Sequence, residues 1–180
     1  LGAFLRIYKL GSESFWFDEA ETFYATQQKS FSSVLDNVYH QGTAAPKYFG
    51  TEGKADSGAM PFNFLLSYYW VKITGLSEFK LRLLPALFGI FSIYMIFLIG
   101  RMLFNYKAGL TAAFILSINY LHIYYSQEAR TYSLIVFLTL ITVYSLLNAL
   151  KKSKAKKRNR QPRKSFHSVF CFRVYTGFSI

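Results

Sequence analysis

The stretch LLPALFGIFSIYMIFLIG, residues 83–100, has 18 consecutive residues without a charge and lies between Arg82 and Arg101. A helix needs about 20 apolar residues to cross the roughly 30 Å hydrocarbon core of a bilayer. Buried helices of soluble proteins rarely run to this length without a charge, so that alternative explains the stretch less well. Residues 83–100 therefore predict a membrane-spanning helix.

Two more uncharged runs follow, at 108–127 and 131–150, and each has 20 residues. Both lengths match the hydrocarbon core of a bilayer. The sequence therefore predicts an all-α integral membrane protein, built as a multi-pass helical bundle. The predicted spans lie at about 83–103, 108–125 and 131–150.

The composition excludes several other classes of protein. Of the 180 residues, 52% are hydrophobic and 19% aromatic, which is too apolar and too rich in rings for an ordinary soluble domain. The net charge is +12, but ten of the 21 basic residues lie within 151–173, so the rest is close to neutral. Such uneven charge does not indicate a nucleic-acid partner. The single cysteine, Cys171, excludes an internal disulfide framework and a cysteine-based metal cluster.

The placement of charge predicts the orientation in the membrane. The turn 101–107 and the run 151–164 are basic and contain no acid, so both are expected in the cytoplasm. The segment before residue 83 and the turn at Glu128 then face the opposite, external side. All nine acids of the chain fall on that side, although the spans were assigned without reference to them.

A long external loop, at about 11–82, is expected to contain interfacial helices. Its run 57–71 is uncharged and rich in aromatic residues but only 15 residues long, which suits a helix lying in the membrane interface. A spanning helix there is the minority alternative. It would move Asp18 to the cytoplasmic face, away from Glu128.

Both ends of the chain show departures from the central pattern. The chain begins at Leu1 rather than Met, and we interpret its N-terminus as missing sequence. Residues 151–180 form a basic cytoplasmic tail. Its last part, 165–180, has no helical or strand period, and two interpretations remain open: a truncated further span or a sequence out of frame.

Residues 15–21, FWFDEAE, place three aromatic residues directly before the acids Asp18, Glu19 and Glu21. Acids in the first turn of a helix complement its dipole, which is a structural explanation. Aromatic residues are also enriched where a membrane meets water, and acids held there are often functional. Two other polar segments are expected on the same face, SEFKLR at 77–82 and YYSQEARTY at 124–132.

Acids and arginines at a lipid–water boundary suit the transfer of a sugar from a lipid phosphate. An arginine can bind the phosphate and stabilise it as the leaving group, and a carboxylate can act as general base towards the acceptor hydroxyl. The tight turn between two spans holds Glu128 and Arg130 at the bilayer surface. On spacing alone, a structural ion pair between these two residues is as good an explanation as a function.

Four segments resemble those of polytopic glycosyltransferases of the GT-C fold. They are FWFDEAET (15–22), an aromatic P-x-N-x-LL stretch (61–66), SEFKLRLLPALFGIFSI (77–93) and HIYYSQEARTYSL (122–134). The most similar branch contains the protein O-mannosyltransferases, the aminoarabinose–lipid A transferases and the RgtA/B/C/D-like sugar transferases. The resemblance covers Phe4 to about Leu150, so residues 1–150 are expected to form the N-terminal part of such a domain.

The resemblance implies an inverting transfer of a hexose or pentose at the external face of the cell membrane. The donor would be a polyprenyl-phosphate-linked sugar, and the acceptor would be a hydroxyl group of a lipid, glycan or protein. Membrane lipids would surround the protein. No cofactor is certain, and a divalent metal is possible. Asp18 matches the catalytic base, with Glu19 beside it. The residues that match substrate-binding positions are Arg82, Gln127, Glu128 and Arg130.

The chain also departs from this family. Met60-Pro61 stands where a Pro-Pro pair is frequent in the family. Family members also usually have many more spans, and this difference indicates that the chain is a truncated N-terminal fragment. His122 matches a frequent histidine, although a helix-packing role explains it at least as well. The alternative function is a fragment of a multi-pass transporter or channel. Transport acids usually lie near mid-membrane, whereas these acids lie at the outer boundary.

Overall fold

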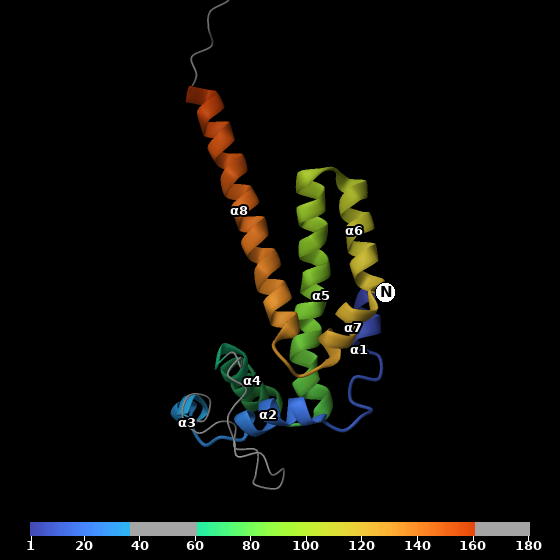
Figure 1. Ribbon diagram of the computed structural model, residues 1–180, viewed down its shortest axis with the longest axis vertical. Coiled ribbons are helices and arrows are strands. Elements are labelled where there is room, and N and C mark those ends of the chain that lie inside the picture. Colours follow the sequence, from blue (N-terminus) through green and yellow to red (C-terminus); the bar gives the residue numbers. More distant parts are fainter. Residues whose placement is uncertain (37–60, 161–180) are drawn as a thin grey trace, which may run out of the picture. The chain divides into compact units, whose positions relative to one another are not determined.

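The structure, a computed structural model, describes residues 1–36 and 61–160. These residues form helices and no strand, which confirms the all-α prediction for this part of the chain. Residues 1–144 make one compact unit, and residues 145–180 make a second unit, of which the last part of α8 is described. The helices are α1 (Gly2–Ile7), α2 (Phe17–Thr26), α3 (Phe31–Asp36), α4 (Pro61–Thr74), α5 (Glu78–Leu103), α6 (Tyr106–Ile118), α7 (Tyr120–Gln127) and α8 (Tyr132–Arg160) (Figure 1).

Two of the described helices are long and apolar enough to cross a membrane, Glu78–Leu103 and Tyr132–Lys156. They correspond to the first and third predicted spans. Ser77 caps the start of α5, because its side chain accepts a hydrogen bond from the Lys80 N–H at 3.2 Å. A serine at this position supplies an acceptor for one of the unpaired N–H groups at the helix start.

The second predicted span, 108–125, is two helices rather than one. Asn119 has an extended backbone between α6 and α7, and its side chain accepts a hydrogen bond from the His122 N–H at 2.9 Å. Asparagine is among the preferred residues at a helix N-cap, so it ends one helix and begins the next. Apolar composition alone does not reveal such a break. The first part, α6, has 13 residues and is shorter than the two candidate spans.

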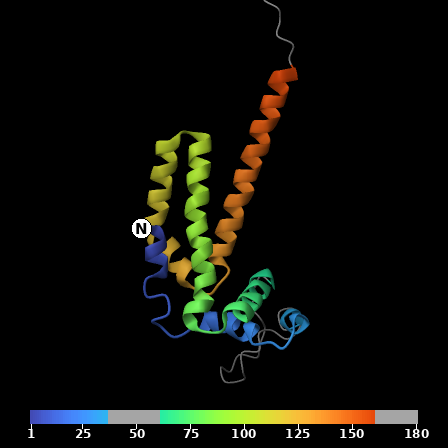
Figure 2. The same ribbon diagram turned by 180° about the vertical axis from the view of Figure 1, so that it is seen from behind.

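Two glycines allow α5 and α6 to pack closely as a hairpin (Figures 1 and 2). A Cβ atom built on Gly109 would lie 2.6 Å from the Phe97 carbonyl oxygen, and one on Gly100 would lie 2.8 Å from the Gly109 Cα. Small residues at helix contacts let two backbones approach closely in membrane proteins. A larger residue at either position would therefore push the hairpin apart.

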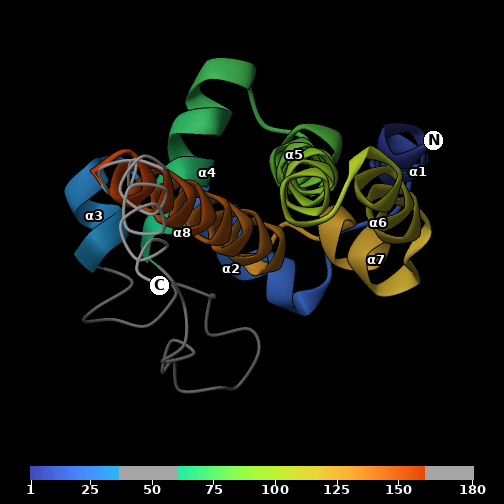
Figure 3. The same ribbon diagram turned by 90° about the horizontal axis from the view of Figure 1, so that it is seen from above.

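The shorter helices lie on opposite sides of α5. In Figure 3, α4 lies on one side and α1, α6 and α7 on the other. Helix α4 corresponds to the predicted interfacial segment 57–71, although residues 57–60 lie outside the described residues. It packs on α2 and α3 through a small core that contains Ala25, Val34, Phe64 and Tyr68. These contacts hold α2, with its acids, near the start of α5.

Candidate active site

Glu19 and Arg82 form a buried ion pair that joins α2 to α5. The Nη2 atom of Arg82 lies 2.5 Å from Oε2 of Glu19, and its Nε atom lies 2.9 Å from Oε1. The Arg82 and Glu19 side chains are only 6% and 2% exposed. A two-pronged contact between guanidinium and carboxylate restricts geometry more strongly than a single hydrogen bond. The pair therefore fixes the position of α2 relative to α5.

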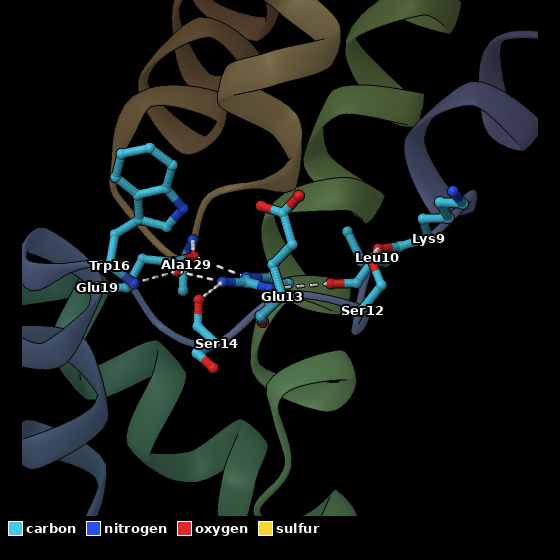
Figure 4. A network of polar contacts seen from close by, with 9 residues as sticks. Lys9, Leu10, Ser12, Glu13, Ser14, Trp16, Glu19 and Ala129 are labelled. Atoms are coloured by element: carbon cyan, nitrogen blue, oxygen red, sulfur yellow. Dashed lines mark hydrogen bonds and ion pairs between the residues drawn. The ribbon is translucent and has the colours of Figure 1, made fainter.

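The remaining donors of Arg82 hold the segment before α2. Nη1 donates to the carbonyl oxygens of Leu10, at 3.3 Å, and Glu13, at 2.7 Å, while Nη2 donates to that of Ser14 at 3.0 Å (Figure 4). A guanidinium has five N–H donors, and each of them has an acceptor here. The resemblance assigns Arg82 to substrate binding, and a substrate phosphate bound by it would have to displace one of these acceptors.

Glu19 also binds the turn between α7 and α8. Its Oε1 atom accepts a hydrogen bond from the Ala129 N–H at 2.8 Å, and its Oε2 atom accepts one from the Trp16 N–H at 3.2 Å. Burial by itself would raise the pKa of Glu19. The hydrogen bonds and charge of Arg82, with the two backbone N–H groups, outweigh burial, so the pKa lies below its usual 4.5. Glu19 is therefore a stable anion that holds three segments together.

The other predicted acid, Asp18, lies in the first turn of α2, but its side chain lies outside what the structure describes. Glu21, to which sequence analysis assigned no role, pairs with Arg130: Nη1 lies 2.8 Å from Oε2. These side chains are 15% and 16% exposed, so water reaches this pair more than the Glu19–Arg82 pair. Two contacts thus bring the 127–130 turn to α2.

Gln127 and Glu128 have different surroundings. The Nε2 atom of Gln127 donates to the carbonyl oxygens of Leu5 and Tyr8, at 3.1 Å each, and so holds the end of α1. Glu128 follows the last residue of α7 and lines a neighbouring cleft. Both predicted substrate-binding residues therefore line the cleft, and Gln127 also holds the end of α1.

The cleft has a volume of about 260 Å³. It lies between the 8–16 segment and α7, with Glu19 and Arg82 on its wall. Sequence analysis did not single out Tyr8, Lys9 or Glu13, because only the folding of this segment around Arg82 brings them to the cleft. The lining residues are Tyr8, Lys9, Leu10, Ser12, Glu13, Trp16, Glu19, Arg82, Tyr124, Gln127 and Glu128.

Residues 59–158 match the family model described as dolichyl-phosphate-mannose-protein mannosyltransferase. The chain belongs to this family. The match includes Arg82 and the 127–130 turn, and it begins after residues 15–22. It confirms the resemblance at the level of a membrane glycosyltransferase of the mannosyltransferase type. No curated protein and no solved structure gives a significant match.

This mannosyltransferase-family chain has a second buried arginine, Arg6, that sequence analysis did not single out. Its guanidinium donates to the carbonyl oxygens of Leu116 at 3.1 Å and Ser117 at 3.2 Å, at the end of α6. It also lies 2.6 Å from Nδ1 of His122. His122 therefore contacts the break between α6 and α7, as its helix-packing interpretation suggests.

A possible divalent metal was left open by the resemblance. Within the described residues, no group of three or more His, Cys, Asp or Glu side chains has a geometry that could hold a metal ion. In the candidate site, the carboxylates of Glu19 and Glu21 bind arginines, and Glu19 also accepts hydrogen bonds from backbone N–H groups. Glu19 is the clearest example.

Proposed function

We propose that this chain supplies the acid and arginine residues of a glycosyltransferase site on the external face of the cell membrane. The site transfers a sugar from a polyprenyl-phosphate-linked donor to a hydroxyl group of a lipid, glycan or protein. One observation carries this proposal: the Glu19 carboxylate binds both Arg82 and the Ala129 N–H. It therefore joins the three segments that resemble the family's site.

Asp18 is the general base in this proposal. The acceptor oxygen attacks the anomeric carbon of the sugar, its proton passes to Asp18, and the polyprenyl phosphate leaves with the electron pair of the broken bond. A single displacement of this kind inverts the anomeric centre. A carboxylate suits this role if it lies within hydrogen-bond reach of the acceptor hydroxyl. Glu19, the next residue on α2, fixes the position of that helix.

Arg130 is the better candidate for the contact with the donor phosphate. All five donors of Arg82 have acceptors in the surrounding protein, and its side chain is buried. Arg130 belongs to a more exposed ion pair with Glu21, which a phosphate can reach. Positions 18 and 21 are three residues apart on α2 and so share one face of the helix. Arg130 is thus bound on the face that carries the proposed base.

The replacement Asp18→Asn tests this function in the full-length protein in membranes. Transfer of mannose from dolichyl phosphate mannose to a hydroxyl acceptor should fall by about 100-fold or more, because general-base catalysis contributes at least that much. Membrane insertion should be unchanged. Glu78→Gln is the matched control, since Glu78 is an exposed acid at the start of α5 that does not line the cleft. Full transfer by Asp18→Asn would disprove the assignment of the base.

A further inference from the structure

Glu13 differs from the other acids around the site. Its backbone carbonyl accepts a hydrogen bond from Arg82, but its carboxylate makes no ion pair or hydrogen bond within the described residues. The side chain is exposed and lines the cleft. In Figure 4 its carboxylate points away from the hydrogen bonds that surround Glu19. The backbone of Glu13 is thus held in place while its carboxylate remains available to a ligand.

Exposed aromatic rings line the same cleft. Trp16 is 59% exposed and Tyr8 is 56% exposed, and Tyr124 lines the cleft from α7. Carboxylates accept hydrogen bonds from hydroxyl groups, and an aromatic face offers apolar contact to the C–H face of a ring. Pockets for small ligands typically combine an apolar surface with a small number of polar groups. This combination suits the ring of a neutral sugar.

The charge in the cleft favours a neutral sugar over a phosphate. Arg82 and Glu19 compensate each other in their ion pair. The remaining charged residues that line the cleft are Lys9, Glu13 and Glu128, so acids outnumber bases. An anion would be repelled by this excess of negative charge, whereas hydroxyl groups donate well to carboxylates.

We propose that the cleft binds the sugar of the lipid-linked donor, and that Glu13 accepts hydrogen bonds from its hydroxyl groups. This inference rests on the proposed function, which supplies the lipid-linked sugar. Glu13 is then a substrate-binding residue that recognises the sugar, while the phosphate lies outside the cleft near Arg130. The backbone bond from Arg82 to Glu13 sets the position from which the carboxylate reaches the ligand.

Binding of two probes to the full-length protein in detergent tests the inference. Titration calorimetry with dolichyl phosphate mannose and with dolichyl phosphate separates the sugar from the lipid and its phosphate. Glu13→Ala should weaken binding of dolichyl phosphate mannose by about tenfold, because hydrogen bonds to a charged group are lost. It should leave binding of dolichyl phosphate unchanged, since the Glu13 carbonyl still accepts from Arg82. Trp16→Leu should show the same pattern, and the control Glu78→Ala should change neither affinity.

The outcomes separate this inference from the proposed function. Equal binding of dolichyl phosphate mannose by Glu13→Ala and the unchanged protein would overturn the inference, even if transfer depends on Asp18. An equal loss of affinity for both probes would also overturn it, because the effect would not come from the sugar. Sugar-dependent binding that is lost in Glu13→Ala would support it, even if Asp18→Asn retained full transfer.

Discussion

Arg6 and Arg82 are both buried, but they are stabilised in different ways. Arg82 has a carboxylate partner in Glu19 and an acceptor for each N–H. Arg6 binds backbone carbonyls and His122, with no carboxylate among its described partners, and its Nε atom has no hydrogen bond. The first arrangement joins separate segments around a site. The second arrangement supplies hydrogen-bond donors to carbonyl groups at the end of α6.

The difference between Arg6 and Arg82 shows two ways in which a buried charge is stabilised. The end of α6 carries partial negative charge on its unpaired carbonyls, which favours a nearby cation. That field is weaker than the full charge of a carboxylate, so Arg6 depends on several modest contacts. Arg82 depends mainly on one strong contact, and loss of either partner leaves the other charge buried. The two sites should therefore respond differently to substitution.

The largest effect is expected for Arg82→Met. This replacement keeps much of the side-chain volume but leaves Glu19 ionised and buried without its partner. Removal of one member of a buried pair costs about 3–5 kcal/mol. The free energy of unfolding in detergent, measured by denaturant titration, should fall by that amount. The double variant Glu19→Leu/Arg82→Met should recover a large part of the loss, and no recovery would contradict the assignment to an uncompensated charge.

A smaller effect is expected for Arg6→Met. The carbonyl oxygens of Leu116 and Ser117 lose their donor, but no carboxylate is left uncompensated, so the loss should be about 1–3 kcal/mol in the same measurement. Arg101→Met is the control, because Arg101 is exposed at the other end of the α5–α6 hairpin. If Arg6→Met destabilised the protein as strongly as Arg82→Met, the two arginines would not differ as we infer.

The smallest effect on stability is expected when the pH is lowered, because protonation of Glu19 keeps the side chains of both Glu19 and Arg82 in place. The pKa of Glu19 is lowered in the folded protein, so its ionised form contributes stability at pH values above 4.5. That contribution is lost as the pH falls from 4.5 through the lower folded pKa. Unfolding measured from about pH 6 to about pH 3 should show this loss, and Glu19→Gln should lack it. An unchanged pH dependence in Glu19→Gln would assign the acid sensitivity to other groups.

The helices of the membrane part follow largely from the sequence, but one break in them does not. Long runs without charge predict α5 and the apolar part of α8, because only helices of that length bury their backbone in a bilayer. The same criterion joins α6 and α7 into one span. The signal that separates them is a single residue, Asn119, whose capping side chain competes with a continuous helix.

Some residues of the candidate site were selected from the sequence, but their contacts were not predictable. Motif resemblance selected Glu19 and Arg82, which are 63 positions apart in the chain, yet their spacing does not show that they bind each other. It also assigned Arg82 to substrate, whereas the structure engages all its donors with protein. Glu13 belongs to no recognised motif, and at the cleft its carbonyl accepts a hydrogen bond from Arg82, which is distant in the sequence. Tertiary contacts of this kind have no local pattern in a sequence.

The bond from the Ala129 N–H to Glu19 has a consequence for the motions of the protein. Because Glu19 also binds Arg82 and the Trp16 N–H, the turn after α7 cannot separate from α2 without uncovering a carboxylate shared by three segments, α2, α5 and the turn itself. Partial openings of a protein occur in cooperative units whose members separate together. Amide exchange at Ala129 therefore follows the opening of this whole unit rather than local fraying of a surface turn.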